Sequence, residues 1–154
     1  MMTENIFEIM LQNRKNLHAI LTKIPTEKLL EIPSGFNNNV YWNIAHTVAT
    51  QQVLIYKLSG LQMRIPKELV AKFSKGTVPD GTATDEEMMM VADFLISTAE
   101  WLIEDYDTAL FQTFNEYKTS AGVTLKNVDD AIVFNLLHEG LHLGQINLLL
   151  KQLA

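Results

Sequence analysis

Two of the four histidines in the chain, His138 and His142, are four residues apart near its carboxyl end. In an α-helix this spacing points the two side chains about 40° apart on one face, so both imidazoles can bind one metal ion at about 2.1 Å. The other residues on that face are mostly apolar: Ala131, Phe134, Leu141, Gln145 and Leu149. Two neutral imidazoles in an apolar interior need polar partners, and a shared metal ion satisfies both. From spacing alone, a metal site and a pair of packed structural histidines both stay open.

His46 shares its helical face with Trp42, Asn43, Ala49, Thr50 and Val53. A single histidine among such neighbours is usually a packed residue with one hydrogen bond. It also points a third imidazole toward the same interior, from a distant part of the sequence. If the paired histidines bind a metal ion, His46 is the candidate third ligand, and Asn43 or Thr50 is a candidate to orient the ligands or the substrate.

The string from His138 to His142 reads H-E-G-L-H and matches the zinc-peptidase pattern, in which the glutamate is the general base. A peptidase of this kind needs a third ligand downstream, but Leu148 stands where metzincins have histidine, and no Asp, Glu or His follows His142. Glu139 also lies about 80° from the bisector of the pair. We therefore interpret Glu139 as a supporting residue at the side of the helix and a weak catalytic candidate, and we do not favour a peptidase. Gln145, one turn beyond His142, is the other catalytic candidate.

Four long segments with apolar residues at three- and four-residue spacing can position these side chains. They predict helices over residues 3–24, 39–60, 85 to about 113, and 127 to about 152. Asn39, Thr84 and Asn127 are suitable caps at three of the starts. Shorter helices are expected at 27–31 and 66–73, and a short extended stretch at 123–125. The sequence therefore predicts an all-α protein, a four-helix bundle with a long crossover between helices 2 and 3.

Arg14 lies in the apolar stripe of the first predicted helix, where a guanidinium needs a carboxylate or access to solvent. The favoured interpretation is a structural pair with a carboxylate of the bundle. The functional alternative makes Arg14 an anchor for an anionic substrate beside the metal ion.

The last predicted helix is apolar on nearly every side. Its apolar residues away from the histidines are Val133, Leu136, Leu137 and Leu143, and Gly140 and Gly144 also point outward. A helix that is apolar all round is normally buried all round, so we expect a homodimer, the alternative being packing within one chain.

Composition narrows the function further. The chain has 154 residues, which favours a single domain over 1–154, and a net charge of −6 with no basic run longer than two residues. Nucleic-acid binding is therefore not expected. There is no cysteine to act as a ligand or nucleophile. The amino terminus lacks a signal-peptide pattern and no apolar run is long enough for a membrane span, so we expect a cytoplasmic protein without a membrane partner.

The chain resembles the DinB-like (YfiT-like) helical bundle proteins over nearly its whole length. The resemblance rests on the stretch W-N-I-A-H that ends at His46, after a P-S-G-F-N loop, and on H-E-G-L-H-L-G-Q-I from His138 onward. It implies a three-histidine metal site on His46, His138 and His142. It also implies, more broadly, transfer or isomerisation reactions that use a low-molecular-weight thiol such as bacillithiol or mycothiol, or metal-dependent hydrolysis.

Two functional hypotheses follow. In the first, a divalent zinc, nickel or iron ion on the three histidines activates a thiol or water for attack on a small-molecule substrate. In the second, the protein is a non-enzymatic stress-response protein that binds metal or a small ligand. A cleft with room for an organic substrate above the metal would favour an enzyme, and a closed, saturated site would favour the second hypothesis.

Overall fold

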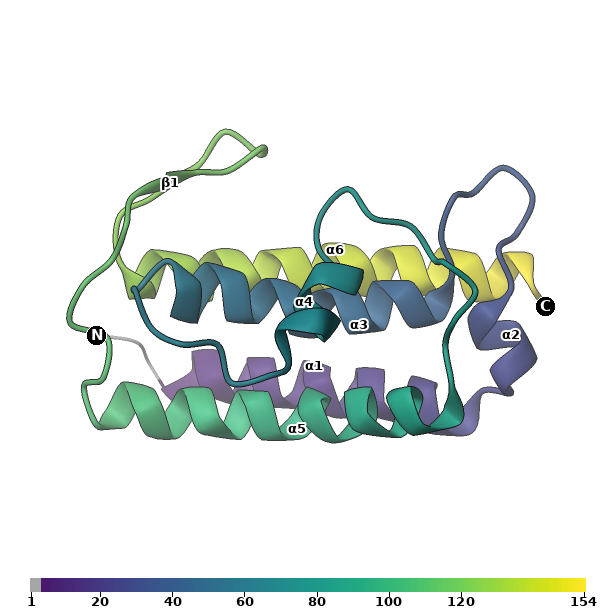
Figure 1. The fold of residues 1–154 in the computed structure, drawn as a ribbon, viewed down its shortest axis with the longest axis horizontal. Coiled ribbons are helices and arrows are strands. Elements are labelled where there is room, and N and C mark those ends of the chain that lie inside the picture. The colour runs from purple at the N-terminus through teal and green to yellow at the C-terminus, as the bar shows by residue number, and fades with distance from the viewer. Residues whose placement is uncertain (1–3) are drawn as a thin grey trace.

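Four long helical segments run side by side in two layers (Figure 1) in the computed structural model, which describes residues 4–154. In one layer α1 (Glu4–Lys23) packs along α5 (Asp85–Asp107), and in the other α3 (Val40–Gln51) packs along α6 (Val128–Gln152). The π-helical segment η1 (Gln52–Lys57) continues α3. The predicted all-α four-helix bundle is confirmed. Residue 3, where the first helix was predicted to begin, lies outside the described residues.

The long crossover between the second and third long helices spans residues 58–84 and contains α4 (Lys67–Lys72), which lies over the bundle in Figure 1. A second short helix, α2 (Thr26–Leu30), joins α1 to α3. Strands β1 (Tyr117–Lys118) and β2 (Thr124–Leu125) form a small antiparallel hairpin that projects from one end of the bundle. Both predicted short helices and the short extended stretch are therefore confirmed. Among the helices of residues 4–154, none is long and apolar enough to cross a membrane.

Three of the long helices begin at the caps that the sequence predicts. The side-chain oxygens of Asn39, Thr84 and Asn127 each accept a hydrogen bond from the backbone N–H three residues further on, at 2.7, 3.1 and 2.8 Å. Such a cap satisfies a backbone donor that has no partner inside the helix and typically contributes about 1 kcal/mol. The amino-terminal ends of α3, α5 and α6 are therefore fixed by local sequence.

The carboxyl end of α5 differs from the prediction, because the helix ends at Asp107 and not near residue 113. The backbone N–H of Leu110 donates to the carbonyl of Asp105, and that of Ala109 to the carbonyl of Tyr106, both at 3.0 Å. Ala109 has a left-handed backbone, with φ of 53°. This pair of bonds is the Schellman arrangement that ends helices, usually with glycine at the left-handed position. Alanine there gives no stop signal, which is why the predicted end was wrong.

Buried polar side chains cross the middle of the bundle and separate two apolar clusters. One cluster includes Leu17, Val48, Leu95 and Ile146, and the other includes Met10, Leu54, Leu102 and Ile132. Between them along the four long helices lie the buried residues that we call the central polar layer: Arg14, Gln51, Gln52, Thr98, Asn135 and Glu139. Buried polar groups are costly unless they are hydrogen-bonded, so this layer constrains how the four helices fit together.

Candidate metal centre

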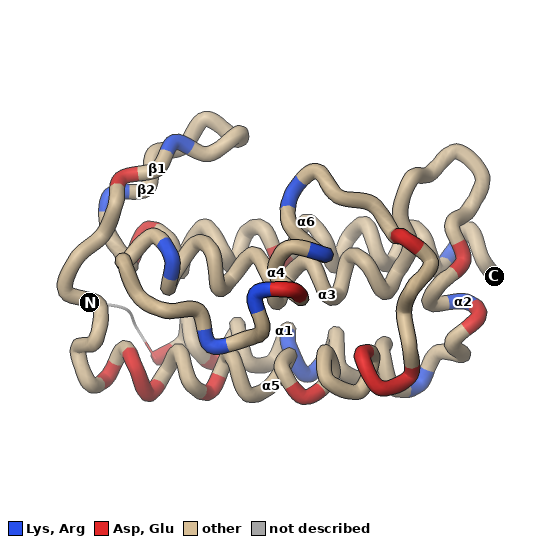
Figure 2. Tube along the Cα trace, viewed as in Figure 1, with Lys and Arg blue, Asp and Glu red and all other residues tan. Residues whose placement is uncertain are grey.

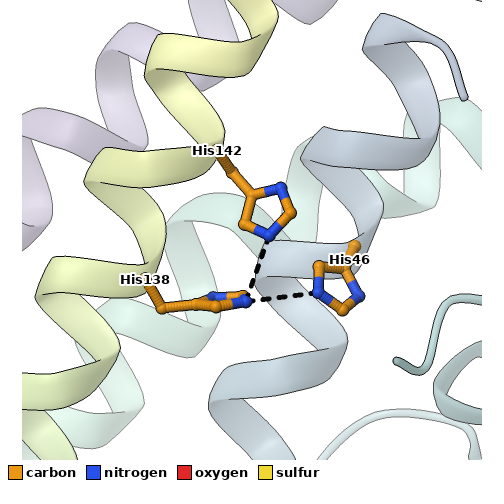
Figure 3. A group of neighbouring side chains, drawn as sticks. All are labelled: His46, His138 and His142. Carbon is orange, nitrogen blue, oxygen red and sulfur yellow. Dashed lines mark hydrogen bonds between the residues drawn. The ribbon is translucent and has the colours of Figure 1, made fainter. Parts of the chain in front are cut away.

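The three predicted histidines meet between α3 and α6, with their rings directed toward one another (Figure 3). The Nε2 atom of His138 lies 3.2 Å from Nε2 of His46 and 3.1 Å from Nε2 of His142. One ligand nitrogen from each ring lies within 4.8 Å of the other two. A tetrahedral ion with bonds of about 2.1 Å separates its ligand atoms by about 3.4 Å. The cluster is therefore compatible with a metal site.

The ring of His46 is oriented by the crossover. Its Nδ1 lies 2.7 Å from the backbone carbonyl oxygen of Phe73, which follows α4. Because a carbonyl only accepts, Nδ1 must carry the proton, and Nε2 is then an unprotonated acceptor that faces the cluster. The hydroxyl of Thr50, one turn further along α3, lies 3.3 Å from this Nε2. His46 is thus held in the tautomer that a metal ion requires.

The ring of His142 is oriented in the same way by Asn43. The Asn43 amide nitrogen donates to the Asn38 side-chain oxygen at 3.0 Å and to the Asn39 carbonyl at 2.8 Å. Its oxygen therefore faces His142 and accepts from Nδ1 at 2.7 Å. This again leaves Nε2 of His142 as a bare lone pair. In contrast, Nδ1 of His138 is buried and has no hydrogen-bond partner among the described residues.

Two bare nitrogens on opposite helices therefore point at the third ring. His138 can donate one proton from its Nε2 to one of them, but it cannot satisfy both. A cation satisfies all three nitrogens at once, provided that His138 carries its proton on Nδ1. The donor set, three neutral imidazoles with two of them fixed by hydrogen bonds, thus fits a divalent ion.

Burial keeps these imidazoles uncharged. It lowers the pKa of His46, against the opposing effect of the hydrogen bond to Phe73. Burial, followed by the charges of His46 and Lys75, lowers the pKa of His138 to about 4. Burial and then the charges of His138 and His46 lower the pKa of His142 to about 3. Since a metal ion binds only the neutral form of imidazole, the three rings are in the binding form at neutral pH.

Trp42 covers one side of the cluster. Its ring stacks on His46, with centroids 4.6 Å apart and planes 12° apart, and its indole nitrogen donates to the Thr77 hydroxyl at 3.1 Å. Trp42 and Phe73 also line a largely apolar cavity that encloses about 520 Å³, its open mouth included. None of the three histidines lines this cavity, so it lies beside the cluster and not directly over it.

Arg14 and Glu139 form an ion pair inside the central polar layer, and neither side chain is exposed. Arg14 donates to one Glu139 oxygen from Nε at 2.8 Å and from Nη2 at 2.6 Å, and to the Thr98 hydroxyl from Nη1 at 2.9 Å. Glu139 also accepts from Asn135 at 2.9 Å and Asn13 at 3.2 Å. The prediction of a bundle carboxylate as partner of Arg14 is confirmed. Arg14 and Glu139 are hydrogen-bonded to each other. Neither group is therefore available for its alternative role, Arg14 as a substrate anchor or Glu139 as a catalytic group.

The remaining predicted residues divide between those that contact the histidines and those that do not. Asn43 and Thr50 lie against the rings of His142 and His46. Gln145 is half-buried on α6, and no hydrogen bond to its side chain is present among residues 4–154. Sequence reasoning missed Phe73 and Thr77. A backbone carbonyl has no sequence signature, and both residues lie in the crossover, where no periodic pattern indicates which side chains point inward.

Together the fold and the site define a class: an all-α bundle in which two antiparallel helices bring three imidazoles together in a cluster compatible with a metal ion. The chain belongs to the DinB superfamily, whose family model matches residues 10–146. The match runs from α1 to the last turns of α6 and includes all three histidines. No curated protein matches the chain.

Proposed function

We propose that this protein is a metal-dependent enzyme that binds a divalent ion on His46, His138 and His142 and acts on a small molecule. The observation that carries the proposal is the fixed tautomer of His46 and His142, which directs two bare Nε2 atoms at the third ring. Three protein ligands leave coordination positions open, which is typical of catalytic and not of structural metal sites. Zinc, nickel and iron(II) all accept three imidazoles.

When bound, such an ion lowers the pKa of a coordinated thiol or water and makes it a nucleophile at neutral pH. The protein's own groups prepare the site. Asn43 orients the ring of His142, and the carbonyl of Phe73 orients the ring of His46. Trp42 excludes water from one side of His46. The most specific form of the proposal is transfer of a low-molecular-weight thiol to a small electrophile. Hydrolysis, with water as the nucleophile, uses the same site.

Metal content tests the site. Protein purified without a nickel resin should contain about one equivalent of divalent metal, measured by plasma mass spectrometry, and His142→Ala should contain far less. His18→Ala is the matched control, because His18 lies on α1 outside the cluster. Equal metal content in the wild type and His142→Ala would overturn the assignment of the site.

Turnover tests the enzyme. The metal-loaded protein should accelerate the reaction of a small thiol with a chlorodinitrobenzene electrophile, and a chelator should abolish the acceleration until metal is returned. A protein that binds metal through the three histidines, but shows no metal-dependent turnover with any common bacterial thiol and no hydrolysis, would instead be a metal- or ligand-binding stress protein.

A further inference from the structure

Residues 73–77, the segment that follows α4, are attached to the candidate metal centre at both ends. At one end the carbonyl oxygen of Phe73 lies 2.7 Å from Nδ1 of His46. At the other end the Thr77 hydroxyl accepts from the indole nitrogen of Trp42 at 3.1 Å, and Trp42 stacks on His46. The same hydroxyl lies 2.8 Å from the carbonyl oxygen of Ser74, which closes the turn. The segment is therefore held against the histidines.

Lys75 lies in the middle of this segment and is exposed. Its ammonium group makes no ion pair with any described residue, whereas the neighbouring Lys72 contacts Glu87 at 2.6 Å. The structure thus places a cation, unpaired among the described residues, on the segment that is hydrogen-bonded to His46 at one end and to Trp42 at the other.

The charge distribution of the chain supports the same view. The crossover, residues 58–84, contains four of the twelve Lys and Arg residues and only two of the eighteen Asp and Glu residues. In Figure 2 these blue segments gather on the crossover and α4, while α5 carries mostly red. The protein as a whole has a charge of −6. A locally positive crossover in an acidic protein attracts anions to a region that also orients His46.

We propose that Lys75 binds an anionic group, a carboxylate in the first instance, of the small molecule that reaches the metal centre. This inference rests on the proposed function, and it narrows the small molecule to an anionic substrate or a thiol that carries an anionic group. Arg14, the anion anchor that the sequence suggested, does not compete for this role because Glu139 and Thr98 occupy its guanidinium. Lys75 is exposed, makes no ion pair with a described residue, and lies two residues after Phe73, whose carbonyl oxygen contacts the ring of His46.

Binding of two thiols to the cobalt(II)-loaded protein tests the proposal, because the cobalt absorption bands report any ligand that reaches the metal. Mercaptoacetate and 2-mercaptoethanol both present a thiol, and only the first has a carboxylate. We expect Lys75→Ala to weaken mercaptoacetate about tenfold, the effect of one partly screened ion pair, and to leave 2-mercaptoethanol unchanged. Lys75→Glu should weaken mercaptoacetate further, and Lys75→Arg should retain most of the affinity.

Lys67→Ala is the matched control, since Lys67 is an exposed lysine of α4 with the same charge and no contact to the cluster. The proposal is overturned if Lys75→Ala leaves mercaptoacetate unaffected, if it weakens both thiols equally, or if Lys67→Ala has the same effect. Failure of the proposed function looks different: the wild-type protein then binds no cobalt, or its cobalt bands respond to neither thiol, and both proposals fall.

Discussion

Replacing Glu139 by glutamine separates two roles for this residue, because the H-E-x-x-H pattern makes it a general base and the structure makes it the partner of Arg14. The substitution keeps the shape of the side chain and removes its charge. It leaves the Arg14 guanidinium fully buried with no counter-charge. It also turns one accepting oxygen into an amide donor, facing either Asn13 or the pair of Arg14 and Asn135.

The expected cost is large. Breaking a buried ion pair from one side typically destabilises a protein by about 3–5 kcal/mol, which is a large part of a total stability of about 5–15 kcal/mol. We therefore expect Glu139→Gln to lower the free energy of unfolding by at least about 3 kcal/mol. Urea unfolding followed by circular dichroism measures it. Arg14→Met/Glu139→Leu removes both charges and should cost less than Glu139→Gln, because no unpaired charge stays inside.

Arg64→Met is the control for the loss of an ion pair as such. Arg64 contacts Asp105 at 2.8 Å, but its side chain is 36% exposed and the pair is open to solvent. Exposed pairs contribute about 0–1 kcal/mol, so this variant should unfold near the wild-type midpoint. A Glu139→Gln protein that unfolds within about 1 kcal/mol of the wild type, yet has lost metal-dependent hydrolysis, would refute the structural role and restore the general base.

Three further predictions concern other parts of the molecule. Because the folded-state pKa is about 4 for His138 and about 3 for His142, the unfolded chain takes up protons first as the pH falls below about 6.5. The metal-free protein should therefore lose stability as the pH falls from about 6.5 toward 4, and the urea midpoint of His142→Ala should depend on pH less steeply. Ala109→Gly should raise the free energy of unfolding by about 1 kcal/mol, because glycine adopts the left-handed backbone without strain; no change in urea midpoint would contradict this. Leu137, 53% exposed on α6, is expected to lie in a homodimer interface, so Leu137→Glu should give a monomer by light scattering at micromolar concentration. A wild type that is already monomeric would end that prediction.

The helices could be predicted from the sequence where local chemistry alone decides them. Asn39, Thr84 and Asn127 are caps because their side chains bond the backbone three residues later, an interaction that involves no distant partner. The end of α5 is also formed by local backbone hydrogen bonds, but alanine stands at the left-handed position where glycine is usual, so the residue type that would indicate the helix end is absent. Sequence patterns therefore predict the three helix starts but not the end of α5.

The histidine cluster could be predicted because helix periodicity constrains the direction of side chains. His138 and His142 had to share a face, and His46 had to point inward among apolar neighbours. Of the groups near the rings, one lies on a predicted helix and the others lie on the crossover. Asn43 lies three residues before His46 on the same helix and was found. The carbonyl of Phe73 and the charge of Lys75 lie on the crossover, whose path depends on packing over α3 and not on any repeat in its own sequence.

Arg14 and Glu139 show why direction is not enough to assign a role. In the sequence each is a single charged residue on a helix with an apolar face. Arg14 has a functional interpretation as a substrate anchor, and Glu139 has one as a general base. Helix geometry correctly predicts that the Glu139 side chain points away from the bisector of His138 and His142. It does not predict which residue of another helix Glu139 contacts. The partner is 125 residues away in sequence, and its presence converts two candidate catalytic charges into one neutral buried pair. The consequence for the proposed mechanism is that Glu139 is not available as a base beside the histidines, so a nucleophile bound at this centre would lose its proton to solvent. In the proposed binding of an anionic group, the positive charge would likewise come from the crossover and not from Arg14.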